Sequence, residues 1–153
     1  MGRERENYNI SRPWKSIQHG REISKGGISR PTAKRHIHPK GDYAQWAKRG
    51  LAKLDSERAR LKGLKAYFAH ASVGWDDNPR YPEKRPYVTG SSPEKFEKVL
   101  RSAKEWYDRN TPPGYPKLIS INAWNEWIEG SYLEPDEKHG MGYLEAIRRV
   151  FVR

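Results

Sequence analysis

Hydrophobic residues recur at helical spacing in the segment 42–62. Asp42 follows Gly41 and stands just before the first of them, where a carboxylate side chain can cap the exposed N–H groups of a helix. The pattern predicts one amphipathic helix over 42–62. Its apolar face would carry Tyr43, Trp46, Ala47, Leu51, Leu54 and Leu61.

A second helix is predicted over 93–108. Ser92 suits the N-cap position and Pro93 the first helical position, after a proline-rich loop, and the sequence TPPGYP then ends the helix. A last helix is predicted from Gly142 to Phe151. The apolar positions of these two helices are Phe96, Val99, Leu100, Ala103, Trp106 and Tyr107 in the first, and Tyr143, Leu144, Ile147, Val150 and Phe151 in the second.

Two short apolar runs lie between these helices. Residues 64–73 end at Gly74 and predict one strand, and residues 117–123 predict another. Helices that alternate with strands favour an α/β fold in which the strands are parallel. Loops that follow the carboxyl ends of parallel strands meet on one face. Adjacent strands would therefore bring four acidic residues into one cleft: Asp76, Asp77, Glu126 and Glu129.

Residues 1–40 show neither helical nor strand periodicity, and we interpret them as an irregular basic arm before a domain over 41–153. The net charge of +11 belongs to the first half, since residues 71–153 hold 13 basic and 13 acidic residues. The arm lacks interleaved aromatic residues and any nucleic-acid-binding motif, which argues against RNA or DNA as a partner. His36 and His38 are the only histidines with paired spacing, and we predict no metal site and no cofactor.

The remaining composition limits the classes of function. The chain has no cysteine, which excludes disulfides, thiolate metal sites and cysteine nucleophiles. No apolar run is long enough for a membrane span, and the sequence MGRERENYNI lacks the apolar core of a signal peptide. We expect a soluble, cytoplasmic protein, and nothing in the sequence indicates an oligomeric state.

The segment INAWNEWIEGSYLEPD, residues 121–136, combines residues that suit a sugar-processing site. Two carboxyl groups can flank a glycosidic bond, one donating a proton and the other acting as base or nucleophile. Glu126 and Glu129 are three residues apart and can face the same side of a helical turn. Tryptophan faces pack on pyranose rings and asparagine amides bind hydroxyl groups. The residues of these types are Asn122, Trp124, Asn125 and Trp127.

Each of these features also has a structural explanation. A glutamate pair three apart is commonly a solvated helix face, and a tryptophan at a strand end, such as Trp75, commonly belongs to the core. Asp77 precedes Asn78 and Pro79, a sequence typical of a turn. Arg80 could form a salt bridge with Asp76 or bind an anionic group.

The combination of segments is more specific than its parts. Residues 74–80 (GWDDNPR), 90–100 (GSSPEKFEKVL) and 121–147 resemble the C-terminal part of the WbsX-like family of polysaccharide biosynthesis, which is related to glycoside hydrolase family 99, the endo-α-mannosidase group. The resemblance covers about residues 66–152. It implies the C-terminal portion of a (β/α)8 TIM-type barrel, with these segments as its last two strands and their helices, and an oligosaccharide or polysaccharide substrate.

The resemblance also implies roles for single residues. Glu126 matches the carboxylate that takes the proton of the sugar 2-hydroxyl, which then attacks the anomeric carbon and forms a 1,2-anhydro sugar. Glu129 matches the acid that protonates the leaving oxygen. Ile128 stands where the mannosidases commonly have histidine. The substrate-binding residues would be Trp75, Asp76, Arg80, Asn122, Trp124, Asn125, Trp127, Tyr132 and Glu134.

We therefore expect a carbohydrate-active protein, a glycoside hydrolase or glycosyltransferase acting on mannose-like glycans. A complete barrel needs about 250 residues and eight strands. With two predicted strands, the chain is expected to be an incomplete barrel, poorly stable and inactive alone. Two alternatives remain open, a non-catalytic carbohydrate-binding remnant and a basic nucleic-acid-binding protein.

Overall fold

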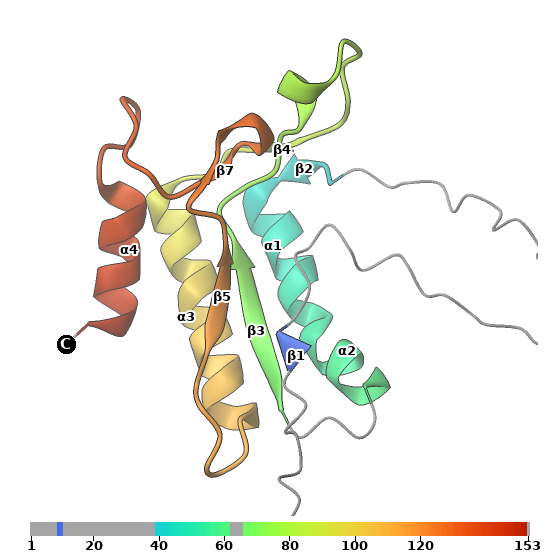
Figure 1. The fold of residues 1–153 in the computed structure, drawn as a ribbon, viewed down its shortest axis with the longest axis vertical. Helices are drawn as coiled ribbons and strands as arrows, with labels where there is room; N and C mark the ends of the chain where they lie inside the picture. Colours follow the sequence, from blue (N-terminus) through green and yellow to red (C-terminus); the bar gives the residue numbers. More distant parts are fainter. Residues whose placement is uncertain (1–8, 11–38, 62–65, 153) are drawn as a thin grey trace, which may run out of the picture.

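The computed structural model describes residues 9–10, 39–61 and 66–152 (Figure 1). Most of the predicted arm, including His36 and His38, lies outside the described residues. Two of its residues form a strand, however, which corrects the prediction that this segment contains none. This strand, β1 (Asn9–Ile10), pairs in parallel with β3.

The central sheet has the order β1-β3-β5, and all its strands are parallel. β3 (Tyr67–Ser72) and β5 (Ile119–Asn122) are the two strands predicted from the apolar runs. They are joined through the helix α3 (Pro93–Asn110). The predicted strand–helix–strand unit with adjacent parallel strands is therefore confirmed. The described strands do not close into a barrel.

Alternation along the strands divides the sheet into two faces. Ala69 and Ala71 on β3, Val73 directly after it, and Ile119 and Ile121 on β5 pack with residues of the helices. The intervening residues point to the opposite face, and these are Phe68, His70, Ser72, Ser120 and Asn122. The helix-covered face is thus apolar, whereas the opposite face is mainly polar.

The helices form a layer on that apolar face, with α4 (Gly142–Phe151) beside α3 (Figure 1). The capping predictions hold, because the Asp42 side chain accepts from the N–H groups of Ala44 and Gln45, and Ser92 accepts from Lys95. The single helix predicted over 42–62 is wrong. It is divided at Lys53 into α1 (Tyr43–Ala52) and α2 (Leu54–Arg60). Gly50 weakens the helix here, and its carbonyl accepts the Lys53 N–H in a tighter turn.

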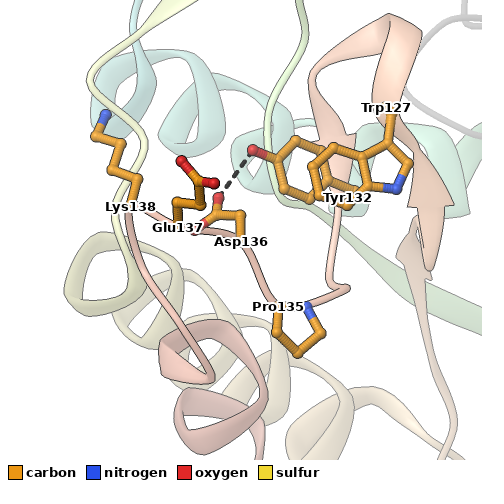
Figure 2. A pocket seen from close by; sticks show the side chains of 6 residues that line it. All are labelled: Trp127, Tyr132, Pro135, Asp136, Glu137 and Lys138. Carbon is orange, nitrogen blue, oxygen red and sulfur yellow. Dashed lines mark hydrogen bonds between the residues drawn. The ribbon is translucent and has the colours of Figure 1, made fainter.

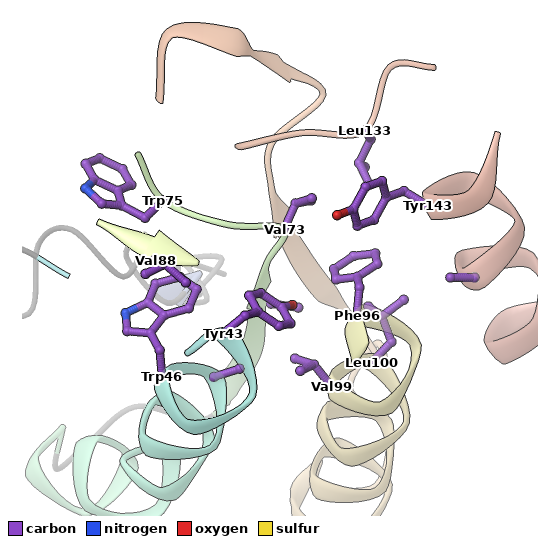
Figure 3. Packing of buried hydrophobic residues seen from close by; sticks show 13 residues of the cluster. Tyr43, Trp46, Val73, Trp75, Val88, Phe96, Val99, Leu100, Leu133 and Tyr143 are labelled. Atoms are coloured by element: carbon purple, nitrogen blue, oxygen red, sulfur yellow. The ribbon is translucent and has the colours of Figure 1, made fainter. Parts of the chain in front are cut away.

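The core fills the space between the helices and the carboxyl ends of the strands (Figure 3). Tyr43 is completely buried and donates its hydroxyl to the carbonyl oxygen of Ser72 at 2.8 Å. Phe96 of α3 packs edge-on against Tyr143 of α4, with ring centroids 5.7 Å apart. This packing fixes the strand ends relative to the helices.

Two short strands hold the proline-rich loop against the start of α1. β4 (Val88–Thr89) pairs in parallel with β2 (Gly41–Asp42). The Val88 N–H also donates to the carbonyl oxygen of Trp75 at 2.8 Å. The loop predicted between β3 and α3 is therefore fixed at both ends. Within the described ranges, none of the helices has the length and apolar character needed to cross a membrane.

Candidate active site at the strand ends

The loops that follow β3 and β5 meet at the carboxyl edge of the sheet. The β3 loop contains the 3₁₀ helix η1 (Asn78–Arg80). The β5 loop forms a small antiparallel hairpin in which β6 (Asn125–Glu126) pairs with β7 (Ser131–Tyr132), and the 3₁₀ helix η2 (Trp127–Glu129) connects them. The Asp76 N–H donates to the carbonyl oxygen of Glu129 at 2.7 Å, which joins the two loops.

Glycines permit this close approach. Gly130 has a φ of +56°, and a methyl group there would lie 3.1 Å from Cβ of Asp76. At Gly74 an added methyl group would meet the carbonyl oxygen of Gly130 at 2.8 Å. A side chain at either position would push the two loops apart.

Arg80 contacts both candidate catalytic carboxylates. Its Nη1 lies 2.9 Å from Oε1 of Glu129, and its Nη2 lies 3.4 Å from Oε2 of Glu126. The contact between the two loops that the sequence predicted is therefore present, but Arg80 rather than an aspartate faces the glutamates. A guanidinium between two carboxylates offsets their mutual repulsion.

The two glutamates have different surroundings. The Glu126 side chain is 44% exposed, whereas that of Glu129 is 2% exposed. A ligand that arrives from solvent can therefore contact the Glu126 carboxylate directly. The Glu129 carboxylate is buried, and the guanidinium of Arg80 lies between it and the solvent. Unequal environments of this kind allow two carboxyl groups to perform different steps.

Behind the hairpin, a polar cluster joins the ends of the two strands. The Asn122 amide donates to the Ser131 hydroxyl at 2.9 Å, and the Ser131 hydroxyl donates to the Asn122 carbonyl oxygen at 2.7 Å. Ser72 lies 3.5 Å from the Ser131 hydroxyl. Asn122 was predicted to bind substrate, whereas neither serine was predicted, because their one signal in the sequence is their position beside strand ends.

The aspartates of the β3 loop serve its local structure. Asp76 Oδ1 accepts from both the backbone N–H and the side-chain amide of Asn78, at 3.0 and 2.6 Å. Asp77 is buried, with Nη1 of Arg85 4.0 Å from its carboxylate. These contacts tie both aspartate side chains to their own loop, whereas Arg80 is the side chain of that loop that reaches both glutamates.

The predicted tryptophans divide between core and surface. Trp75 is 6% exposed and packs in the core cluster, so in this structure its faces are not open to a sugar (Figure 3). Trp124 is 54% exposed and Trp127 is 45% exposed, both on the hairpin that carries the glutamates. Asn125 is also exposed, opposite Tyr132 in the hairpin.

Trp127 is held by its neighbours. Its ring stacks on that of Tyr132 with centroids 3.8 Å apart, and its indole N–H donates to the carboxylate of Glu134. Tyr132 in turn donates its hydroxyl to Asp136 at 2.8 Å. Partial burial and the neighbouring Asp136 carboxylate raise the pKa of the Tyr132 phenol to about 12. Asp136 was not predicted as a site residue.

A groove runs along this aromatic pair. It is widely open to solvent, has a volume of about 630 Å³ and is lined by Trp127, Tyr132, Pro135, Asp136, Glu137 and Lys138 (Figure 2). A cavity of about 290 Å³ shares Tyr132 and Lys138 with the groove and reaches Asp76 and Ser91. Among the residues that the structure describes, no group of three or more histidine and acidic side chains is placed to hold a metal ion.

Known proteins resemble this chain in sequence. The family model for Glycosyltransferase WbsX matches residues 4–147. Proteins named "Uncharacterized protein WxcX", from two strains of Xanthomonas campestris pv. campestris, are each 34% identical over 113 residues, or 74% of this chain. The match spans only 16% of the length of these relatives. No solved structure matches the chain. Because the family model covers almost the whole sequence, the chain belongs to the WbsX glycosyltransferase family.

Proposed function

We propose that this chain carries the catalytic carboxylates of a carbohydrate-active enzyme that acts on mannose-like glycans. The bond chemistry would be glycosidic, either hydrolysis or transfer to an acceptor. Family membership supports a glycan-related protein. The single observation that carries the proposal is the contact of Arg80 with both Glu126 and Glu129 at the carboxyl edge of parallel strands.

The two glutamates have different roles in the proposed reaction, which has two steps. Glu126, the exposed carboxylate, takes the proton of the sugar 2-hydroxyl, and the resulting oxygen forms a bond to the anomeric carbon. The glycosidic bond breaks as Glu129 gives its proton to the leaving oxygen. Water or an acceptor hydroxyl then opens the 1,2-anhydro ring, passing its proton to Glu129, while Glu126 returns its proton to the 2-oxygen.

Arg80 must move for this reaction to begin. An acid must hold a proton, whereas the ion pair at 2.9 Å is made by the carboxylate of Glu129. We propose that substrate hydroxyl groups displace the guanidinium, whose side chain is 39% exposed and free on its solvent side to rotate. Arg80 would then bind the substrate beside the reacting sugar.

We further propose that residues 41–153 form the last part of a (β/α)8 barrel. Support comes from the parallel pairing of β3 with β5 and from helices that cover one face of their sheet. In a barrel the opposite face of the sheet would line the interior. The remaining strands would come from other parts of the polypeptide, and the chain alone would then be inactive.

Product analysis with substituted glutamates tests the catalytic proposal. We would measure release or transfer of sugar from α-mannan oligosaccharides by a full-length WxcX protein that carries the matching substitutions, and by the chain itself, which should be inactive. Glu126→Gln and Glu129→Gln should each lower turnover by at least about 100-fold. Glu105→Gln removes an exposed glutamate on α3 and should leave turnover unchanged. Full turnover in both site variants would contradict the proposal.

A carbohydrate-binding protein without catalysis is the second candidate. Two exposed tryptophans on one hairpin favour it, since exposed indoles are typical of sugar-binding surfaces. Calorimetric titration would then show oligosaccharide binding, while product analysis would show no broken bond with either the chain or the full-length relative.

A further inference from the structure

The groove beside the Trp127–Tyr132 pair has no role in the reaction described above. Neither Glu126 nor Glu129 lines it, although Trp127 lies between them in the sequence. It is a hollow of about 630 Å³ that is widely open to solvent, so a ligand bound there would keep part of its surface in water. The groove therefore lies next to the carboxylate pair but outside it.

The aromatic wall of this groove is rigidly placed. One face of Trp127 is covered by Tyr132, and its N–H is bound to Glu134, which fixes the orientation of the ring. Tyr132 is itself fixed through Asp136, which also accepts the His139 N–H. With 45% of Trp127 exposed, the indole is a preorganised surface on which a pyranose ring can pack without ordering a mobile side chain.

Polar groups complete the groove. In Figure 2 the aromatic pair lies at one side and Lys138 at the other, with the carboxylates of Asp136 and Glu137 between them. Carboxylates accept and an ammonium group donates hydrogen bonds to hydroxyls. Two carboxylates against one ammonium group would repel an anionic sugar. This chemistry selects a neutral, hydroxyl-rich ligand.

We infer that this groove binds a neutral sugar unit of the glycan at a position beyond the reacting sugar. Trp127 would pack on the ring, and Lys138 with Glu137 would bind its hydroxyl groups. That the ligand is a sugar rests on the proposed function, whereas the position of the binding site rests on the groove itself. The adjoining cavity, which shares Tyr132 and Lys138, would extend the site along the glycan. Binding energy from such a remote unit can be used to position the reacting bond.

The inference can be tested by nuclear magnetic resonance without any turnover. We would titrate the ¹⁵N-labelled chain with α-mannotetraose, β-mannotetraose and cellotetraose. At least one should cause saturable shifts of the Trp127 indole N–H and the Tyr132 and Lys138 amides. Lys138→Ala should weaken that binding about 3- to 10-fold, and Trp127→Ala by at least about 10-fold. Lys98→Ala, an exposed lysine on α3, should not change it.

Two results would overturn the inference: the absence of groove shifts with all three tetrasaccharides, or binding that Lys138→Ala leaves unchanged. The Lys138 variant is decisive even if Trp127→Ala disturbs folding, because Lys138 is an exposed surface residue. Failure of the catalytic proposal would look different. Glu126→Gln and Glu129→Gln would then keep turnover in the full-length relative while the groove resonances still shifted.

Discussion

The backbone N–H of Asp76 donates to the carbonyl oxygen of Glu129 at 2.7 Å, across the gap between the two strand-end loops. This bond places Glu129 relative to the β3 loop through the main chain, independently of side-chain rotamers. Gly130 follows Glu129 directly and faces Asp76 with no side chain between them. The position of the buried glutamate therefore depends on a glycine outside the reacting groups.

Gly130→Ala should destabilise the protein by about 2–4 kcal/mol. Its φ of +56° costs an alanine about 1 kcal/mol, and the methyl group 3.1 Å from Cβ of Asp76 adds a packing cost of about 1–3 kcal/mol. Urea unfolding measures the loss. Gly140→Ala is the matched control, because its φ is +52° and an added methyl group meets nothing within 4 Å. Equal losses in the two variants would show that the loops separate without cost.

Local signals in the sequence were sufficient to predict the helices and the two main strands. Asp42 and Ser92 cap helices where the sequence placed them, because a cap depends on residues adjacent in the chain. The break at Lys53 was missed because the apolar pattern continues through it. β1 was missed because a strand of two residues is too short to show an alternating pattern. Its pairing with β3 depends on residues far away in the sequence.

The candidate site was predictable in its residue types and less so in its geometry. Clustering of Arg80 with the two glutamates follows from parallel strand order, which the alternation of elements indicated. Trp75 was predicted to bind substrate, with burial in the core as the alternative, because a tryptophan after a strand can turn inward or outward. In the structure it is 6% exposed and packs in the core. Stacking of Trp127 on Tyr132 depends on hairpin register, which sequence alone did not provide.

Replacing Arg80 should lower the stability of the protein more than replacing an arginine of an exposed surface ion pair. Arg80→Met leaves the buried Glu129 without its guanidinium, and because that guanidinium is partly exposed we expect a loss of about 1–2 kcal/mol at neutral pH. Arg101→Met breaks a pair with Glu97 on the surface of α3 and should lower stability clearly less than Arg80→Met does.

A double-variant cycle isolates the Arg80 pair. Glu129→Gln added to Arg80→Met should restore part of the loss, since the buried negative charge that faced the guanidinium is then removed as well. The free energy of unfolding of the four proteins gives the coupling between the two residues. Strictly additive losses would mean that the 2.9 Å contact contributes nothing to stability.

The hydroxyl group and the ring of Tyr132 should make separate contributions to the stability of the protein. Tyr132→Phe keeps the stack on Trp127 and removes the hydrogen bond to Asp136, for a loss of about 1 kcal/mol. Tyr132→Leu also removes the stacked ring, which should cost about 0.5–1.5 kcal/mol more. Thermal unfolding of the two variants separates these contributions. A leucine variant as stable as the phenylalanine variant would show that the stack does not hold Trp127.

His70 should make the protein acid-sensitive. It is 4% exposed on the face of β3 opposite the helices, and burial lowers its pKa to about 4 from an ordinary value of 6.5. Between these values the unfolded chain binds a proton that the folded chain does not. Stability therefore falls as the pH falls from about 6.5 towards 4. Below about pH 4, His70 causes no further loss of stability. The whole loss in free energy of unfolding that His70 causes over this pH range is about 3 kcal/mol.

Urea unfolding at pH 7 and pH 5 measures this effect as a difference between proteins, because acidic groups titrate in all of them. On acidification from pH 7 to pH 5, wild type should lose about 2 kcal/mol more than His70→Gln does. Ser120→Ala removes the hydroxyl 2.8 Å from Nδ1 of His70 but keeps the imidazole. It should lower stability at both pH values while preserving the wild-type dependence on pH. A glutamine variant with the wild-type dependence would contradict the assignment to His70, since the proton must then bind elsewhere.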